Sequence, residues 1–352
     1  MPDAIWIDRD DELPALAQRL KSQAWIGVDT EFLRERTFFP KLCLLQLAAA
    51  GRVWCVDTLA VGSLDPLMPA LTAAGACKVI HAARQDLEAV YLSSKRVMSP
   101  VFDTQIAAGC VGLKPQVGYA ELVKTLLDVT VPKGQTRTDW SKRPLTHEQL
   151  AYAADDVQYL GDVADLLSQR LRELGREHWV LEDCVALEDQ ELYEPDPAQA
   201  WVRLRGLAQL EPKSRARAKT IAIWREKLAR SRDLPRAWIL PDAAIFSVAL
   251  GSEPPLNDSL AANLQGALEE AANDVVDQEP GQDARPTAAQ KALIERLGKI
   301  VDARAAELNV SAEILAPRGE LKSLAYGKPR DSHVLTGWRR DEIGIRLLEA
   351  IG

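Results

Sequence analysis

Four acidic residues and one tyrosine have the spacing most suggestive of chemistry. Asp29 and Glu31 follow the apolar residues 25–28 and stand two apart, so on a strand both carboxylates leave the same face, about 6–7 Å apart. Two anions held this close repel each other unless a cation lies between them, and a divalent ion with oxygen ligands is the natural counter-charge. For this pair alone, the alternative is two solvated acids at a strand edge.

A third acid stands at the start of an expected helix. Asp86 follows a predicted strand at residues 78–82 and falls in the first turn of the helix after it. That position lies near the carboxyl end of the strand, where sites in α/β proteins usually form. The alternative is an acid that only complements the helix dipole.

The remaining candidates lie on one later helix. Tyr152 and Asp156 are four residues apart and share a helical face, whereas Asp155 lies about 100° round the helix. Ala153 and Ala154 are small enough for this helix to lie close against a sheet, and an aspartate packed there needs a partner. The alternative is that Tyr152 and Asp156 lie on an exposed edge of the helix.

Strands and helices in a recognisable order must position these residues. Apolar runs predict strands at residues 5–7, 25–32, 42–48, 53–57 and 78–82, and helices at 10–20 and 64–74. The strands from 25 to 57 form an expected antiparallel meander, and the pattern from 82 to about 172 is helical. Strand–helix–strand passages of this kind indicate an α/β or α+β domain with a mixed sheet.

The ordered set of motifs resembles a known enzyme class. Asp-x-Glu on a strand, Asp at a helix start and Tyr-x-x-x-Asp on a helix are similar to the DEDD superfamily of 3′→5′ exonucleases, in the subgroup with tyrosine in its last motif. Within it, residues 28–47, 78–88, 102–107 and 152–160 look like the ribonuclease D family. The likeness spans about residues 1–190 and implies an α/β ribonuclease H-like exonuclease domain with a mixed sheet.

This resemblance implies a role for each candidate. It makes Tyr152 the catalytic tyrosine and gives the metal ligands as Asp29, Glu31, Asp86 and Asp156. The spacing from Tyr152 selects Asp156 over Asp155, which we expect to face solvent or to lie behind the ligands. Four carboxylates suffice for two Mg²⁺ or Mn²⁺ ions, which would clamp the attacking and leaving oxygens of a phosphodiester. A phenol of pKa about 10 would orient the attacking water rather than act as its base.

The expected function is a metal-dependent 3′→5′ exoribonuclease. It would trim RNA 3′ ends, such as those of transfer RNA precursors, and release nucleoside 5′-monophosphates one at a time. The expected partner is structured RNA with a single-stranded 3′ end, bound by a monomer. Two alternatives are a DNA exonuclease of the same fold, because nothing in the metal site senses the 2′-hydroxyl, and an inactive nucleic-acid-binding protein.

Weaker candidates for substrate binding surround the acids. Thr30 and Phe32 flank them and could border the terminal nucleotide. A polar loop before the last motif contains Lys133, Gln135, Arg137 and Trp140. A basic loop with one aromatic residue suits a flexible nucleic-acid strand. The alternative is a solvated loop whose tryptophan caps the core.

Composition sets broader limits. The 352 residues predict two or three domains, and 47% hydrophobic with 27% charged residues is ordinary for a globular protein. Five cysteines without a CxxC pair favour a reducing compartment and no zinc site. The N-terminal residues lack a signal-peptide layout, and no apolar run approaches the ~20 residues of a membrane span. We therefore expect a cytoplasmic protein.

Charge is unevenly distributed. The net charge of −8 argues against a nucleic-acid partner, yet residues 198–240 carry a surplus of eight positive charges. Residues 218–230 and 234–242 resemble the HRDC domain, a helical module that RecQ-type helicases and ribonuclease D share, which implies nucleic-acid binding. The candidate contacts are Arg215, Arg217, Lys219, Arg225 and Lys227. The alternative is that these basic residues bind no partner and only form a solvated helix face.

Two Pro-rich breaks predict the domain boundaries. They lie at residues 194–197 and 274–286. Residues 313–321 and 336–339 resemble the second, more divergent HRDC-like domain of ribonuclease D. We therefore predict an exonuclease domain at 1–193, followed by two small all-helical domains, an HRDC domain at 198–273 and an HRDC-like domain at 287–352.

Overall fold

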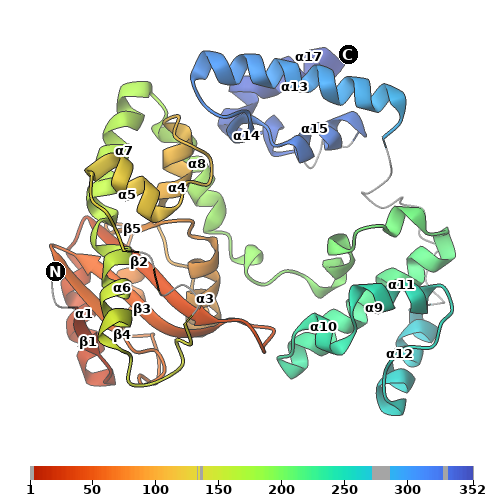
Figure 1. Ribbon diagram of the computed structural model, residues 1–352, viewed down its shortest axis with the longest axis horizontal. Coiled ribbons are helices and arrows are strands. Elements are labelled where there is room, and N and C mark those ends of the chain that lie inside the picture. The colour runs from red at the N-terminus through yellow and green to blue at the C-terminus, as the bar shows by residue number, and fades with distance from the viewer. Residues whose placement is uncertain (1–3, 133, 135–137, 272–285, 328–331, 352) are drawn as a thin grey trace. The chain divides into compact units, whose positions relative to one another are not determined.

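A computed structural model describes residues 4–132, 134, 138–271, 286–327 and 332–351 (Figure 1). The chain divides into two compact units. The first contains Met1–Leu33, Leu42–Tyr193 and Thr287–Gly352, and the second contains Arg34–Lys41 and Glu194–Pro286. The predicted break at 274–286 lies almost wholly outside the described residues. Among the described residues, no helix has the length and apolar character needed to cross a membrane.

A mixed sheet forms the centre of the first unit. Its strands are β1 (Ile5–Ile7), β2 (Trp25–Leu33), β3 (Lys41–Ala49), β4 (Arg52–Val56), β5 (Cys77–Ile80) and β6 (Val101–Asp103). Their order is β1-β4-β3-β2-β5-β6. β3 and β4 pair antiparallel, whereas β1 with β4, β2 with β5 and β5 with β6 pair parallel. β3 is buried on both faces, as its nearly continuous apolar run predicts.

Helices cover both faces of the sheet. α1 (Leu13–Lys21), α2 (Met68–Leu71) and α3 (Arg84–Ser94) bury their apolar residues with Leu45 and Leu47 of β3. α6 (His147–Gln158) and α7 (Leu160–Leu174) pack on the opposite face, where Leu44 and Ala48 point. α6 lies across the strands in Figure 1. The period-two alternation of β3 therefore separates two helical layers.

Two predicted elements differ from the structure. The helix expected at 64–74 is regular only over α2, because turns occupy the residues before it. β6 lies in the region that the apolar pattern marked as helical, and it is followed by α4 (Thr104–Cys110) and α5 (Tyr119–Leu127). β6 has only two apolar residues before Asp103, whereas β1, which has the same length, is wholly apolar and was predicted.

The final segment packs into the first unit. α13 (Ala288–Leu308), α14 (Ala312–Leu315), α15 (Arg318–Ala325) and α17 (Ile345–Ile351) share a hydrophobic cluster with α4, α7 and α8 (Glu177–Leu187). The Trp338 and Trp179 rings stack at 4.1 Å and 9°. The structure thus groups residues 287–352 with the mixed sheet and its helices, and the boundaries of three separate domains remain a prediction.

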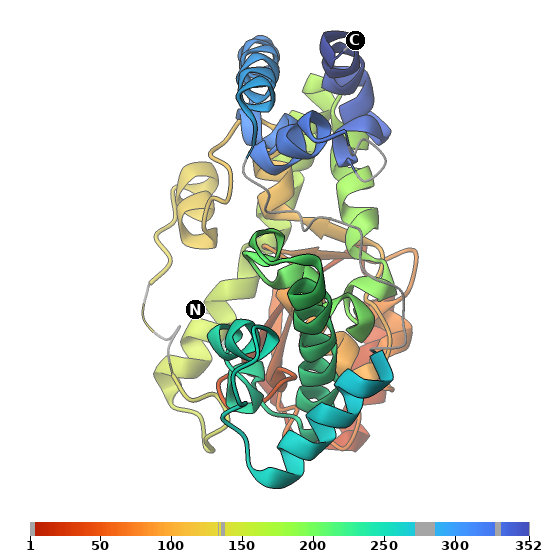
Figure 2. The same ribbon diagram turned by 90° about the vertical axis from the view of Figure 1, so that its right-hand side faces the viewer.

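The second unit is helical and includes a loop from the sheet. α9 (Pro212–Arg232), α10 (Arg236–Ile239), α11 (Asp242–Ala249) and α12 (Asp258–Ala271) surround one core (Figure 2, green to cyan). Phe38, from the loop between β2 and β3, is buried in this core. The backbone N–H groups of Phe38 and Phe39 both donate to Asp233 Oδ1 at 3.0 Å.

Candidate active site

The acid pair lies on the face of β2 that α6 and α7 cover. Trp25, Gly27, Asp29 and Glu31 alternate onto this face. A methyl group at Gly27 would lie 3.1 Å from the Val157 carbonyl oxygen. The absence of a side chain at Gly27 therefore allows α6 to lie close to the strand, next to the two acids.

Three carboxylates converge at this place. Single carboxylate oxygens of Asp29, Glu31 and Asp156 all lie within 4.8 Å of one another, a grouping able to hold a metal ion. Asp86 lines the same cavity, which has a volume of about 370 Å³ and also borders Tyr152. The structure thus brings all four predicted acids and the tyrosine to one cleft, although they come from three distant segments of the chain.

Asp86 is held from two sides. It is 7% exposed, and its Oδ1 accepts a hydrogen bond of 2.6 Å from the Thr30 hydroxyl on β2. The start of its helix is fixed by Asp103, whose carboxylate accepts from the backbone N–H groups of Ala82 (3.1 Å) and Ala83 (2.8 Å). Ala82 has a φ of 58°, an uncommon left-handed conformation for alanine that these hydrogen bonds stabilise.

The helix that carries Tyr152 and Asp156 begins at a capping box. Thr146 Oγ1 accepts from the Gln149 N–H at 3.2 Å, and Gln149 Oε1 accepts from the Thr146 N–H at 2.8 Å. This reciprocal pair satisfies backbone donors that the first helical turn leaves unpaired. The start of α6 is therefore defined by local sequence, and Tyr152 and Asp156 lie one turn apart on this helix.

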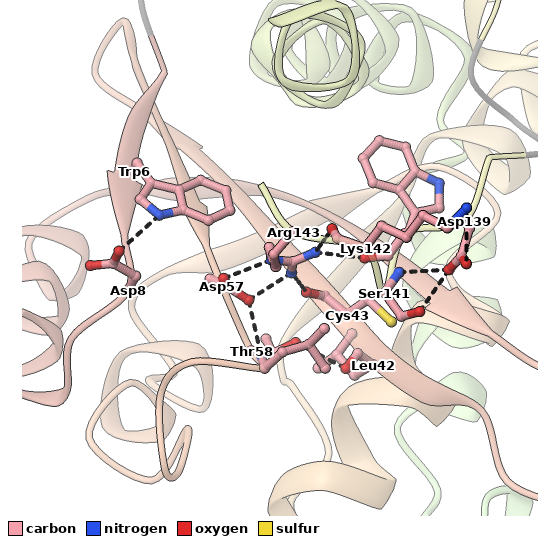
Figure 3. A network of polar contacts seen from close by, with 12 residues as sticks. Trp6, Asp8, Leu42, Cys43, Asp57, Thr58, Asp139, Ser141, Lys142 and Arg143 are labelled. Carbon is pink, nitrogen blue, oxygen red and sulfur yellow. Dashed lines mark hydrogen bonds and ion pairs between the residues drawn. The ribbon is translucent and has the colours of Figure 1, made fainter. Parts of the chain in front are cut away.

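Arg143 joins the segment before α6 to the sheet (Figure 3). Its Nε and Nη2 donate to the two Asp57 carboxylate oxygens at 2.7 and 2.6 Å, and Nη2 also donates to Cys43 O at 2.8 Å. Its Nη1 donates to the carbonyl oxygens of Trp140 and Lys142 at 2.7 and 2.8 Å. One guanidinium thus links β3, the end of β4 and the loop that leads into α6.

Mutual repulsion and burial shift the acids. Burial raises the pKa of Asp29 well above its ordinary value, and the negative charges of Asp86 and Asp156 raise it further. Burial and the charge of Asp156 raise the pKa of Glu31 to about 8. Burial also raises the pKa of Asp86 and that of Asp156 to about 7. A cluster of this kind stabilises added positive charge, whether protons or a cation.

Tyr152 is a hydrogen-bond donor in this setting. Burial and the charges of Asp156 and Glu31 raise its pKa above the usual value of a phenol. Its side chain is hydrogen-bonded to the Asp156 carboxylate. The hydroxyl therefore keeps its proton at neutral pH, which supports an orienting role over that of a base.

The weaker candidates have mixed outcomes. Thr30 and Phe32 line the cleft, and Thr30 also orients Asp86. Trp140 is 2% exposed and packs in the core beside Tyr152, with ring centroids 6.1 Å apart. Its indole is therefore covered by protein. Trp140 caps the core, as the alternative interpretation of this loop stated. The other three loop candidates lie outside the described residues: Lys133, Gln135 and Arg137.

Of the two positions expected for Asp155, facing solvent or behind the ligands, the structure excludes the first. It is 5% exposed, and Gln158 donates a hydrogen bond to its carboxylate. Its backbone oxygen accepts from the Tyr119 hydroxyl at 3.1 Å. Asp155 therefore does not face solvent, and it lies outside the group of converging carboxylates.

Several cleft residues were not singled out from the sequence. His81, Gln85 and Tyr119 line the cavity. The His81 Nε2 lies 2.9 Å from the Val117 carbonyl oxygen, and burial lowers the His81 pKa, so neutral His81 donates from Nε2. Asp103 could have been identified from the sequence, because an aspartate directly before a helix is a common N-cap residue.

Some basic residues of α9 that we predicted to contact nucleic acid instead contact other residues of the protein. Arg215 and Arg225 are 7% and 6% exposed, and Arg225 Nη1 donates to Asp242 and to Leu240 O at 2.6 and 2.9 Å. Lys219 Nζ lies 3.8 Å from the centre of the Trp201 ring. Arg215 and Arg225 therefore have little surface for a contact with nucleic acid, and their proposed contact stays a prediction.

Comparisons with known proteins agree with this geometry. A family model described as 3′-5′ exonuclease matches residues 4–172, and an HRDC domain model matches residues 214–261. The chain is 36% identical to ribonuclease D of Gluconacetobacter diazotrophicus, over 99% of this chain and 92% of that protein. It is also 36% identical to ribonuclease D of Xanthomonas oryzae pv. oryzae, over 97% of each chain.

The chain belongs to the ribonuclease D family. It is therefore a 3′→5′ exoribonuclease, and enzymes of this family depend on divalent metal ions. The crystal structure of Escherichia coli RNase D, described as an exoribonuclease involved in structured RNA processing, superposes with a TM-score of 0.90 at 27% identity, over 99% of this chain and 98% of that one. The expected fold and enzyme class are confirmed.

Proposed function

We propose that Asp29, Glu31, Asp86 and Asp156 hold two divalent cations, Mg²⁺ or Mn²⁺, and that Tyr152 orients the attacking water. The convergence of three carboxylates within 4.8 Å carries this proposal. Their raised pKa values support it, because anions left this close lack a counter-charge. An all-oxygen donor set suits Mg²⁺ and Mn²⁺ and disfavours softer ions.

Each residue then has a distinct task. When bound, the two ions would supply Lewis-acid stabilisation of the attacking and leaving oxygens in the hydrolysis of a phosphodiester. The Asp29 and Glu31 carboxylates hold the strand side of the site, and Asp156 holds the helix side. Thr30 keeps Asp86 in place. The Tyr152 hydroxyl, fixed by Asp156, directs the water towards the phosphodiester that joins the last nucleotide.

The proposed substrate is the 3′ end of structured RNA, with transfer RNA precursors as the leading class. Support comes from the similarity to Escherichia coli RNase D over nearly the whole chain. Thr30 and Phe32, which line the cleft, would border the terminal nucleotide. We further propose that the chain acts as a monomer and that residues 198–273 form a separate RNA-binding module, in which Arg217, Lys219 and Lys227 remain candidate contacts.

A digestion of 5′-labelled RNA tests the proposal. A hairpin with a single-stranded 3′ tail is incubated with Mg²⁺, Mn²⁺ or EDTA, next to a DNA strand of the same sequence. The proposal predicts a ladder that shortens from the 3′ end with either metal, nucleoside 5′-monophosphate as product, and no cleavage in EDTA. Faster cleavage of the DNA strand would instead support the DNA exonuclease alternative.

One substitution assigns the activity to the cleft. Asp29→Asn should reduce cleavage by on the order of 10³-fold or more, because it removes an anionic ligand from the cluster. Asp162→Asn is the matched control, since Asp162 is exposed on α7 and outside the cavity. A folded Asp29→Asn protein that degrades RNA at the wild-type rate would remove this assignment.

A further inference from the structure

The loop that follows β2 ends in a basic cluster of the second unit. Phe38 of this loop is 6% exposed. The guanidinium carbons of Arg236 and Arg230 lie 4.4 and 5.6 Å from the centre of its ring. Both distances suit cation–π contacts, so the loop and the two arginines order each other.

Four arginines gather here, which we call the arginine cluster: Arg34, Arg203, Arg230 and Arg236. A single buried carboxylate lies among them. Glu226 has a side chain 4% exposed, and it accepts from Arg236 Nε and Nη2 at 2.5 and 2.7 Å. Arg203 Nη1 lies 4.0 Å from the same carboxylate. Glu226 is thus engaged mainly by Arg236.

The cluster has an excess of positive charge. Asp233 is a second carboxylate here, and it accepts backbone N–H groups from the loop, so Arg203, Arg230 and Arg236 outnumber these two acids. Burial lowers the pKa of Arg203, and the positive charges of Arg236 and Arg230 lower it further. Burial would raise the pKa of Glu226, but its hydrogen bonds with Arg236 outweigh that effect and the pKa is lowered. The arrangement therefore favours an additional anion.

Donors remain for such an anion. Arg203 has a side chain 56% exposed, and its ion pair with Glu226 is long. Arg230 adds positive charge beside Arg203, although its own Nε is buried away from solvent. A guanidinium group offers parallel N–H donors that match two oxygens of a phosphate, and such charge-assisted pairs are stronger than neutral ones. A phosphate is therefore the anion that best fits the cluster.

We propose that the arginine cluster binds a backbone phosphate of the RNA strand, upstream of the nucleotide being removed. Arg34 follows Glu31 by three residues, so their Cα atoms are at most about 11 Å apart along the chain. This covalent link ties the cluster to the strand that carries two of the proposed metal ligands. The inference rests on the proposed function and adds a preference for RNA long enough to reach the second unit.

Length-dependent binding by the full chain tests this inference. The variants are Arg203→Gln, Arg230→Gln and the double substitution. Lys213→Gln is the matched control, because Lys213 is exposed on the same helix and lies 17 residues before Arg230, about 25 Å along α9. Affinity for single-stranded RNA of two nucleotides, with a free 5′-hydroxyl, and of twelve nucleotides is measured by fluorescence anisotropy in EDTA at several salt concentrations, and cleavage rates are measured in Mg²⁺.

The double variant should bind the twelve-nucleotide RNA on the order of tenfold more weakly. The slope of the logarithm of its binding constant against the logarithm of the salt concentration should be less steep by about one unit. Its kcat/KM on the dinucleotide should equal that of the wild type, because a dinucleotide has no phosphate upstream of the one that is cleaved, and Lys213→Gln should change neither value. An unchanged affinity and salt slope for the long RNA in a folded double variant would overturn the proposal. An equal loss of kcat/KM on both RNAs would overturn it as well.

Two features keep the outcomes separable. A wild-type protein that binds RNA without cleaving it would count against the proposed function, and the EDTA measurements would still decide the phosphate contact. Thermal melting checks the fold of each variant. If the double variant unfolds, Arg203→Gln alone decides, because Arg203 is the more exposed of the two and its replacement leaves the Arg236–Glu226 pair intact.

Discussion

At the scale of single residues, burial and repulsion between neighbouring acids both disfavour the charged form of the carboxylates at the site. Burial raises the pKa values of Asp29, Glu31, Asp86 and Asp156, and the charges of the neighbouring acids raise those of Asp29 and Glu31 further. Tyr152 adds a donor that stays protonated at neutral pH. These side chains therefore create a demand for positive charge, which a divalent cation satisfies without protonation of the ligands.

Tyr152→Phe should separate orientation from metal binding. The substitution removes one hydroxyl and keeps the ring, so the single-turnover cleavage rate should fall about 100-fold while Mn²⁺ affinity changes less than about threefold. Tyr193→Phe is the control, because the Tyr193 hydroxyl donates to Leu187 O outside the cavity. Equal rates for wild type and Tyr152→Phe would show that the hydroxyl has no role in the reaction.

The raised pKa values also predict how stability depends on pH when metal is removed. The folded protein holds protons on Glu31 up to about pH 8, whereas the unfolded chain releases them near pH 4.5. The free energy of unfolding in EDTA should therefore fall as pH rises from about 5 to about 8, by on the order of 2 kcal/mol. Mg²⁺ should reduce this loss, because it binds the folded state.

Urea unfolding at pH 5.5, 7.0 and 8.5, with EDTA or Mg²⁺, measures this dependence. Glu31→Gln serves as the control, since a neutral side chain at this position should make the curve in EDTA less steep, while Asp86 and Asp156 still contribute to it. A free energy of unfolding that rises with pH in EDTA, or a slope that Glu31→Gln leaves unchanged, would contradict the stated origin of the shift.

At the scale of elements, contacts between distant segments position the site. Gly27 lets α6 approach β2, Asp103 fixes the start of α3, and Arg143 holds the loop before α6 on the sheet. None of these residues belongs to the converging carboxylates. The catalytic spacing is thus a property of local sequence, but the distances between motifs depend on these supports.

Arg143→Ala should impair the site from a distance. The change leaves Asp57, whose side chain is 6% exposed, without its cation, which costs about 3–5 kcal/mol of stability. A shifted α6 should also weaken Mn²⁺ binding. Lys142→Ala is the matched control, because that side chain is 79% exposed. Chemical denaturation and metal titration measure both effects, and an unchanged Mn²⁺ affinity would show that Arg143 does not position α6.

The sequence predicted local features better than distant ones. Alternation along β2 placed Asp29 and Glu31 on one face, and the four-residue spacing chose Asp156 over Asp155. It did not predict β6, which has only two apolar residues, nor the pairing of Arg143 with Asp57, which lies 86 residues away. Burial of a basic residue is also a tertiary property, because it depends on which partner covers that face of the helix.

At the scale of the whole molecule, residues from the middle of the chain and from its last segment share a core. The segment 287–352 contributes Trp338 to the cluster that includes Trp179, and Arg339 donates to both oxygens of Asp183 on α8. Residues 34–41 belong to the second unit, although they lie between two strands of the first. Continuous segments of sequence therefore do not coincide with compact units.

Removal of residues 287–352 should destabilise the exonuclease core. The truncation uncovers the apolar surface around Trp179, which favours aggregation and lowers the melting temperature. Trp338→Ala tests the same contact with less disturbance and should cost about 3–5 kcal/mol. Trp238→Ala is the control, because Trp238 is 60% exposed. Equal melting temperatures for the full chain and the truncated protein would show that the last segment is independent.

The most direct measurement is anomalous diffraction from crystals grown with Mn²⁺. The account predicts two anomalous peaks in the cleft, both within coordinating distance of carboxylates from the set Asp29, Glu31, Asp86 and Asp156. In crystals of Asp156→Asn, at least one of these peaks should vanish. Peaks located elsewhere, or a cleft without manganese in wild-type crystals soaked at millimolar Mn²⁺, would contradict the proposal that these acids hold the catalytic ions.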